Sequence, residues 1–175
     1  MVQAWKEIGP QRYRESFGRY FEDFHVGDVY EHRPGKTVLE SDNHLFTLLT
    51  LNTHPLHFDA EYAKASEFGR NLVVSTYTLA LLIGMSVTDC SQKAIANLGM
   101  DEVRFSGPVF AGDTLYAESE VLSKRESRSR PGQGLGREAR PVQFDARAAG
   151  PPVVVGGRGA APAHMPHGLD DESHQ

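Results

Sequence analysis

The chain has 175 residues, a formal net charge of -5 and one cysteine, and these values exclude several classes of protein. The length suits one domain with a substantial hydrophobic core. The acidic balance gives no general attraction to nucleic acid or to an anionic membrane surface. Cys90 alone cannot form an internal disulfide or a C-x-x-C metal site, which suits a reducing compartment. We therefore expect a cytoplasmic protein.

The amino-terminal segment does not resemble a targeting sequence. Charged residues occur throughout it, whereas a secretory signal has an uninterrupted apolar stretch. The longest apolar run of the chain, Leu79–Ile83, is far too short to span a bilayer. We interpret residues 1–19 as a loosely docked leader with Trp5, Tyr13 and Phe17 as candidate anchors.

Two short strands and a helix are predicted in the next segment. Val29–His32 and Lys36–Leu39 are the candidate strands, and a Pro-Gly turn separates them. A helix is expected to begin near Ser41 and to end near Asn52, because the residue before Pro55 is disfavoured in the α region. Its expected apolar face consists of Leu45, Phe46, Leu48 and Leu49.

The central prediction is a long helix at Ser75–Asp89. This segment has no wide polar face, so we expect the helix to be mostly buried. It would be about 22 Å long, roughly the span of a small domain. Ahead of it, Asp59 can cap a short helix at Ala60–Glu67, and this capping is the simplest role for the Asp59 carboxylate.

Extended segments are predicted after this helix. Ile95–Phe105 is one, and Thr114–Lys124 is the clearest strand of the chain because its apolar and polar residues alternate. The residues expected on its inward face are Leu115, Ala117, Ser119 and Val121. Strands packed around one buried helix indicate an α+β fold with a single sheet.

The composition changes after Gly134, where we place a domain boundary. Residues 131–175 hold six of the ten prolines and eight of the seventeen glycines. Such a segment buries too little apolar surface to offset its ordering entropy, so residues 135–175 are expected to be disordered. The abundance of Arg, Gly, Ala and Pro in residues 135–175 also suggests that this segment is translated out of frame from a GC-rich coding sequence. A genuine disordered tail is the alternative, and in both cases the sheet would lack its last strands and expose the edge of Thr114–Lys124.

A polar cluster precedes the central helix. Asn52, His54, His57 and Asp59 lie within eight residues, at a turn forced by Pro55. A histidine beside an aspartate is often only a structural residue. However, a histidine also exchanges protons near physiological pH, and the following helix could present free N–H groups to an oxyanion.

Other chemistries have less support in the sequence. Metal binding by His54 and His57 lacks a third ligand at a familiar spacing other than Asp59. The chain has no G-x-S-x-G serine hydrolase motif and no glycine-rich phosphate loop. Cys90 is better explained as a small packed residue than as a nucleophile.

The cluster resembles the signature of a known family. NTHPLHFD is similar to the Gly-Asp-x-Asn-Pro-Leu/Ile-His-x-Asp motif of the MaoC-like dehydratases, which are hot-dog-fold (R)-specific enoyl-CoA hydratases. ANLGMDEVRF, VFAGDTLYAESEVL and SKRESRSRPGQG extend the resemblance to a subgroup associated with mesaconyl-CoA or itaconyl-CoA hydration. The resemblance covers about residues 20–134 and implies a hot-dog domain, with an antiparallel sheet wrapped around the central helix.

The resemblance also implies roles for individual residues. His57 matches the catalytic histidine of the family, and Asn52 stands where the family has a catalytic aspartate. His54 matches the asparagine before the proline. Ser75, followed by Thr76, matches the glycine whose N–H polarises the thioester carbonyl. Because an amide cannot act as a base, His57 would have to take the proton from water, with Asn52 orienting that water.

The resemblance implies a hydro-lyase that adds water reversibly to a short enoyl-CoA, including C5 dicarboxylic ones such as mesaconyl-CoA or itaconyl-CoA. It implies a homodimer, no metal and no cofactor, since CoA belongs to the substrate. Arg70 and Arg104 are candidates for binding a distal carboxylate. Two rival functions stay open, a hot-dog acyl-CoA thioesterase and a non-catalytic acyl-CoA-binding protein, and Asn52 is the feature that favours the second.

Overall fold

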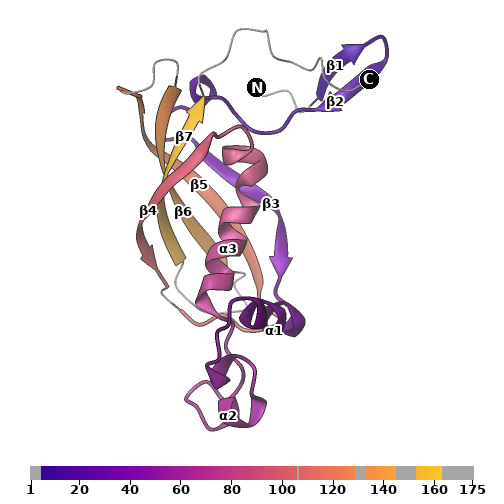
Figure 1. Ribbon diagram of the computed structural model, residues 1–175, viewed down its shortest axis with the longest axis vertical. Coiled ribbons are helices and arrows are strands. Elements are labelled where there is room, and N and C mark those ends of the chain that lie inside the picture. Colours follow the sequence, from indigo (N-terminus) through magenta and orange to yellow (C-terminus); the bar gives the residue numbers. More distant parts are fainter. Residues whose placement is uncertain (1–4, 106, 129–132, 145–152, 163–175) are drawn as a thin grey trace.

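A five-stranded antiparallel sheet and one helix lying against it form the main body of the molecule (Figure 1). The computed structural model describes residues 5–105, 107–128, 133–144 and 153–162. The strand order is β3-β5-β6-β7-β4. The strands are β3 (Val29–Thr37), β4 (Ala96–Arg104), β5 (Thr114–Glu126), β6 (Gln133–Phe144) and β7 (Val153–Pro162). The α+β prediction is confirmed.

The helical elements gather between β3 and β4 in the sequence. They are α1 (Glu40–Leu49), the 3-10 turn η2 (Pro55–His57), α2 (Ala60–Lys64), α3 (Ser75–Met85) and the π-helical turn η3 (Val87–Ser91). A further 3-10 turn, η1 (Phe21–Asp23), precedes β3. In Figure 1, α1 lies at one end of the sheet, next to the amino terminus of α3, and α2 extends beyond that end.

The core lies between α3 and the sheet. Its buried members come from β5, α3 and the loops at the end of the sheet: Val38, Val73, Leu82, Val109, Leu115 and Ala117. The alternation predicted for β5 is confirmed, because Leu115, Ala117, Ser119 and Val121 are all buried. β5 is an inner strand, paired on both edges, and its inward face therefore supplies much of the floor under α3.

Several predicted segments are correct in kind and differ in extent. β3 joins the two short strands expected on either side of the Pro-Gly turn, and it pairs with β5 through an irregular register. α2 ends at Lys64 instead of Glu67. The central helix ends at Met85, and the chain continues to Ser91 as η3, so the prediction of one helix to Asp89 is wrong at its carboxyl end.

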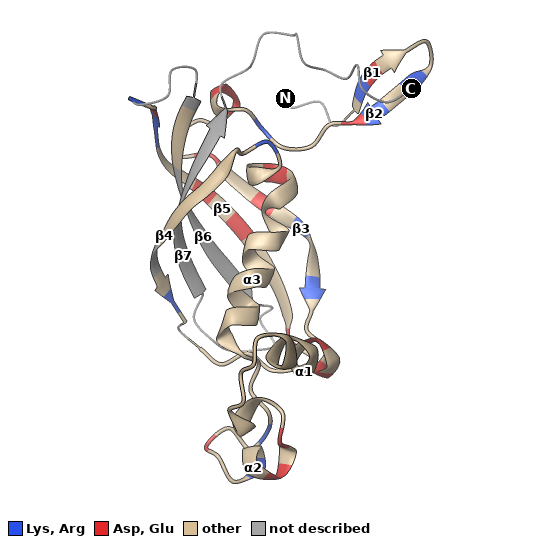
Figure 2. Cartoon of the chain, viewed as in Figure 1, with Lys and Arg blue, Asp and Glu red and all other residues tan. Residues whose placement is uncertain are grey.

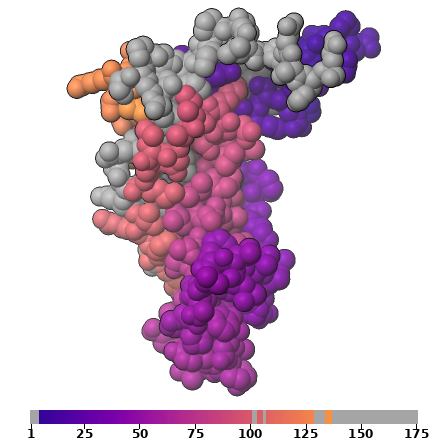
Figure 3. Space-filling model, viewed as in Figure 1, coloured from indigo at the N-terminus to yellow at the C-terminus, as the bar shows by residue number. Residues whose placement is uncertain are grey.

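The expectation that the central helix is mostly buried is wrong for one of its sides. Thr78 and Leu82 face the sheet and are buried. Thr76, Ala80 and Gly84 are exposed, and α3 reaches the surface in Figure 3. A single sheet covers only one side of a helical cylinder, so the apolar character of the other side is left without cover within the described chain.

The predicted apolar face of α1 is also wrong. Its buried residues are Asn43 and Thr47, four apart on one side of the helix. The leucines are exposed instead: Leu45, Leu48 and Leu49. The inward side of α1 meets backbone groups of the loop before α3, and those groups require hydrogen-bond partners. That requirement selects polar residues there.

The predicted leader contains a hairpin. Its strands are β1 (Trp5–Gly9) and β2 (Arg12–Glu15), which pair with each other and form an arm away from the sheet in Figure 1. The three candidate anchors are exposed: Trp5, Tyr13 and Phe17. Contact with the domain is made instead by Arg19, whose guanidinium donates to the carbonyl of Asp89 at 2.7 Å.

Disorder after Gly134 is not what the structure shows for the described part of that segment. β6 pairs with β5, and β7 pairs with both β6 and β4. The expectation of an incomplete sheet with an exposed β5 edge is therefore wrong, because β5 lies between β3 and β6. Residues 145–152 and 163–175 lie outside the described residues. The boundary at Gly134 and the reading-frame hypothesis stay predictions.

Candidate functional site

The turn after α1 brings Asn52 and His54 together. Leu51 adopts a left-handed backbone conformation with φ of 55°, and the Asn52 N–H donates to the Thr47 carbonyl at 3.0 Å. This arrangement ends the helix as in a Schellman motif and fixes the position of the Asn52 backbone. The Asn52 Oδ1 accepts a hydrogen bond from the His54 N–H at 3.2 Å. The amide nitrogen of Asn52 has no acceptor within the described ranges and can donate to another group.

His54 caps the 3-10 turn that carries His57. The His54 Nδ1 accepts from the Leu56 N–H at 3.2 Å, and Pro55 occupies the first position of η2, where no N–H is needed. The rings of His54 and His57 are 5.8 Å apart between centroids. The three polar side chains predicted from the sequence therefore share one loop.

The hydrogen bond made by His57 determines its tautomer. Its Nδ1 lies 2.9 Å from the Leu72 carbonyl oxygen. A carbonyl can only accept, so Nδ1 carries the hydrogen and donates it. In the neutral ring, Nε2 then keeps its lone pair. The ring is half-buried, with Nε2 as the nitrogen available to take a proton.

Asn43 connects His57 to the start of α3, although the sequence analysis did not select it. This side chain is only 3% exposed. Its Nδ2 donates to the carbonyls of His57 at 2.7 Å and Leu72 at 3.2 Å, while its Oδ1 accepts from the Val74 N–H at 2.9 Å. One amide from α1 thus holds both the histidine loop and the residue that caps α3.

The amino terminus of α3 presents free donors beside this clamp. Ser75 and Thr76 are exposed at the first two positions of the helix. No group in the described part of the chain accepts a hydrogen bond from either backbone N–H. These N–H groups and the helix dipole favour negative charge at this end. The arrangement can stabilise an oxyanion.

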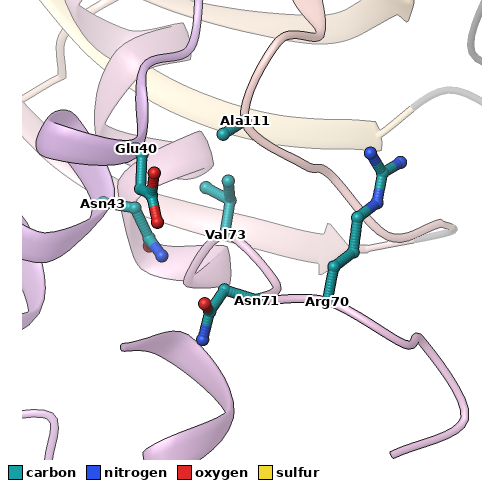
Figure 4. A pocket seen from close by; sticks show the side chains of 6 residues that line it. All are labelled: Glu40, Asn43, Arg70, Asn71, Val73 and Ala111. Carbon is teal, nitrogen blue, oxygen red and sulfur yellow. The ribbon is translucent and has the colours of Figure 1, made fainter. Parts of the chain in front are cut away.

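The two candidate arginines lie in different places. Arg70 lines a cavity of about 180 Å³ near the histidine loop (Figure 4), and its Cζ lies 3.8 Å from the centre of the Phe110 ring. Arg104 is exposed on β4, which pairs with β7, and it does not line this cavity. The structure therefore brings only Arg70 towards the predicted site.

A charged cluster links β3, α1 and α3 near the cavity. Lys36 Nζ lies 2.7 Å from Asp42 Oδ2, and the Tyr77 hydroxyl donates to the same oxygen at 3.3 Å. The hydrogen bond from Lys36, with that from the Leu39 N–H, lowers the pKa of the Asp42 carboxyl. Burial and the Asp42 charge raise the pKa of Tyr77 to about 12. The sequence of α3 contains no Lys, Arg, Asp or Glu, and most of this helix is tan in Figure 2.

Two of the simpler interpretations agree with the structure. Asp59 caps α2, because its Oδ1 accepts from the N–H groups of Glu61 and Tyr62 at 3.0 Å. Cys90 is buried and forms no disulfide. Within the described ranges, no group of three or more His, Cys, Asp or Glu side chains could hold a metal ion, and no helix has the length and apolar character to cross a membrane.

A signal for Asn43 did exist in the sequence. Asn43 and Thr47 are four residues apart, so they share one side of the predicted helix. The spacing of the leucines instead predicts that the apolar side is the buried one. A polar pair on a helix beside an irregular loop can instead face inward, where it satisfies the backbone of that loop.

The fold and this site define a class of protein. The family model described as MaoC like domain matches residues 23–138, so the chain belongs to the MaoC-like domain family. A putative MaoC domain dehydratase from Chloroflexus aurantiacus is similar in structure, with a TM-score of 0.78 and 26% identity over 89% of this chain and 43% of that chain. A Mycobacterium tuberculosis protein described as a double hotdog fold matches with a TM-score of 0.76 and 25% identity over 89% of this chain and 49% of that one. The hot-dog fold is confirmed.

The curated relatives named mesaconyl-CoA hydratase are longer proteins. Mesaconyl-CoA hydratase of Cereibacter sphaeroides is 37% identical over 110 residues, which are 63% of this chain and 32% of that protein. The match therefore spans about a third of the length of that relative.

Proposed function

We propose that this chain is an enoyl-CoA hydratase that adds water reversibly across the double bond of a short enoyl-CoA. The observation that carries the proposal is the His57 tautomer, because its Nδ1–H donates to the Leu72 carbonyl and leaves Nε2 as a base. The similarity to a protein named mesaconyl-CoA hydratase supports the reaction class and suggests a C5 dicarboxylic acyl group.

The chemistry assigns each step to an atom of the chain. His57 Nε2 takes a proton from water, and the resulting hydroxide oxygen bonds to C3 of the acyl group. The electron pair of the C2–C3 double bond moves towards the thioester, which becomes an enolate. The imidazolium of His57 then returns its proton to C2, so atoms and charge balance. Asn52 orients the water through its free amide hydrogens.

The amino terminus of α3 stabilises the negative charge that develops in this reaction. In this proposal the N–H groups of Ser75 and Thr76, which have no acceptor among the described residues, donate hydrogen bonds to the enolate oxygen. His54 shapes the loop by capping η2 and needs no proton-transfer role. The reaction transfers no electrons to an acceptor, so we include no redox cofactor, and CoA enters as part of the substrate. We place the enzyme in the cytoplasm, where CoA thioesters occur.

We also propose that a second copy of this chain completes the molecule. The outward side of α1 presents exposed leucines, among them Leu48 at 74% exposure, and the exposed positions of α3 carry small, uncharged residues such as Ala80 and Gly84. Large exposed apolar surfaces favour association. The double hotdog fold of a structural relative supports a second hot-dog unit as the occupant.

If α1 lies in the dimer interface, a charged residue introduced on its exposed side should disrupt the dimer. Leu48→Glu should lower the apparent mass measured by light scattering after gel filtration from a dimer to a monomer. Glu61→Lys is the matched control, since it changes charge on α2, where the leucine surface is not involved. A monomeric wild type would exclude the dimer.

An absorbance assay tests the function. Wild-type protein with crotonyl-CoA and mesaconyl-CoA should lose the enoyl absorbance without release of free thiol. Thiol release would indicate a thioesterase, and binding without either change would indicate an acyl-CoA-binding protein. His57→Gln should lower kcat by about 100-fold or more, because general base catalysis contributes that much. Wild-type kcat/KM in His57→Gln would exclude His57 as the base.

A further inference from the structure

A cavity lies beside the histidine loop, and none of its lining residues has a role in the proposed hydration steps. Its volume is about 180 Å³, several times the share of one water molecule in the liquid, so it can hold more than ordered solvent. The lining residues come from α1, the loop before α3 and the loop before β5: Glu40, Asn43, Arg70, Asn71, Val73 and Ala111. Figure 4 shows these side chains around a common space.

Arg70 is a cation without a charged partner at this cavity. Its guanidinium stacks on the Phe110 ring, and Phe68 lies against the same ring with centroids 6.3 Å apart. Among the described residues, no carboxylate forms an ion pair or a hydrogen bond with Arg70. Stacking fixes the plane of the guanidinium and leaves its N–H donors free. A planar fork of donors suits a carboxylate.

The cavity is connected to the proposed base through one short segment. Asn71 and Val73 flank Leu72, whose carbonyl accepts from His57 Nδ1 at 2.9 Å. The amide nitrogen of Asn71 donates to the Leu56 carbonyl at 3.1 Å, and its Oδ1 has no donor within the described residues. Asn43 lines the cavity and also contacts the His57 carbonyl at 2.7 Å. The cavity wall and the histidine loop are therefore held together by hydrogen bonds, although His57 itself does not line the cavity.

Glu40 is the opposing charge in the cavity wall. It lies at the first position of α1, on a different side of the space from Arg70 in Figure 4, and the two do not form an ion pair. The amino end of α1 offsets part of the Glu40 charge. Glu40 nevertheless repels an anion, so it must weaken the binding of a carboxylate that Arg70 attracts. Removing the charge of Arg70 should therefore weaken carboxylate binding, and removing the charge of Glu40 should strengthen it.

We infer that this cavity is a subsite for the distal carboxylate of a dicarboxylic acyl-CoA, with Arg70 as its ligand and Glu40 limiting its affinity. The inference rests on the proposed function, because it places the acyl group at His57. It makes Arg70 the specificity-determining residue between dicarboxylic and monocarboxylic acyl groups. Arg104 has no part in the subsite, since it lies on β4 away from the cavity lining.

Equilibrium binding of saturated thioesters tests the subsite without relying on turnover. Succinyl-CoA and butyryl-CoA have acyl chains of the same length, and only the first ends in a carboxylate. Isothermal calorimetry gives the preference as the ratio of the two Kd values. In Arg70→Met this preference for succinyl-CoA should fall about tenfold or more, as for the loss of a charge-assisted hydrogen bond. In Glu40→Gln the preference should rise.

The matched control is Arg33→Met. Arg33 also stacks on an aromatic ring, with Cζ 5.1 Å from the centre of the Tyr116 ring, but it does not line the cavity. Its preference should equal that of the wild type. If Arg70→Met does not fold, as judged by circular dichroism, Glu40→Gln decides the question alone.

The outcomes separate this inference from the proposed function. A wild type that prefers succinyl-CoA but hydrates no enoyl-CoA supports the subsite and contradicts the hydratase proposal. A wild type that hydrates crotonyl-CoA but shows no preference, or variants that shift both Kd values equally, overturns the subsite alone. Failure to bind either thioester overturns both.

Discussion

Asn43 is the residue on which the geometry of the site depends most. Its amide satisfies two carbonyls and one N–H, which belong to the histidine loop, the segment before α3 and the residue that caps α3. Asn43 does not touch the expected position of the reacting atoms, so we regard it as a positioning residue. Its effect on catalysis must pass through His57 and the α3 amino terminus.

Asn43→Ala should lower the free energy of unfolding by at least about 2 kcal/mol, because it leaves buried backbone groups unsatisfied. Urea denaturation measures the change. Asn97→Ala is the control, since Asn97 is exposed on β4 and, among the described residues, its side chain accepts from the Gly99 N–H alone. This variant should change stability by less than about 0.5 kcal/mol.

A positioning role for Asn43 also predicts a kinetic signature. In the folded Asn43→Ala protein, kcat should fall more than KM rises, because His57 is misplaced relative to the α3 N–H groups. Equal losses of stability in Asn43→Ala and Asn97→Ala would contradict the clamp.

Asn52→Asp tests the departure from the family motif. Its Oδ1 would still accept from the His54 N–H, so the loop should keep its shape. The added charge should lower kcat/KM for mesaconyl-CoA about threefold to tenfold relative to crotonyl-CoA, through repulsion of a second carboxylate. Hydration assays with both substrates measure the ratio. Identical ratios in wild type and variant would remove the electrostatic argument.

At the scale of elements, Asp42 joins three of them. It lies in the first turn of α1, accepts from the Leu39 N–H at 3.0 Å, and contacts Lys36 of β3 and Tyr77 of α3. Because the pKa of Asp42 is lowered in the folded state, its stabilisation is present above its ordinary pKa of 3.8 and is lost as the pH falls through the folded value.

Asp42→Asn should therefore cost about 1 kcal/mol of stability at neutral pH, as for the loss of a helix cap. The difference from the wild type should shrink as the pH falls from about 3.8 through the lowered folded-state pKa, below which the wild-type carboxyl is protonated as well. Denaturation curves at several pH values check both points. A difference that is constant with pH would show that the Asp42 charge is not the cause.

At the scale of the whole molecule, β6 and β7 hold the sheet together. β4 pairs with β7, and within the described sheet it reaches β5 only through β7 and β6. β4 would lose its neighbour if the last two strands were removed. The part of the hydrophobic core that lies over β5 would also lose the neighbouring strands β6 and β7.

A chain that ends at Arg128 should consequently lose cooperative unfolding, and its thermal transition by circular dichroism should be broad or absent. A chain that ends at Pro162 keeps every described element and should retain a sharp transition. If the chain ending at Arg128 melted as sharply as the full chain, β6 and β7 would not be needed for the fold. Resequencing of the coding DNA after codon 134 tests the reading-frame hypothesis separately.

The local elements were largely predictable from the sequence. The alternation of β5, the Asp59 cap and the turn at Pro55 depend on neighbouring residues, and each agrees with the structure. The cluster of Asn52, His54 and His57 was predictable for the same reason, because the three residues share one short loop. Local spacing is sufficient where the contacts are local.

The burial of helix faces was not predictable in this way. The leucines of α1 have the spacing of a core-facing side, yet the buried side carries Asn43 and Thr47. That choice depends on the backbone of residues 72–74, which lie far along the chain and present polar groups to α1. Periodicity shows that a helix is two-sided, but the neighbouring segments decide which side is inside.

The sequence by itself determined the α+β class, the family motif and the loop that carries His57, since all of these depend on residues close together along the chain. Only the tertiary structure decided the tautomer of His57, the clamp at Asn43 and the placement of Arg70 beside the cavity. It also decided that residues after Gly134 contribute strands, because backbone pairing with β5 and β4 can order a segment that has no regular apolar alternation. Contacts between distant segments decide such features.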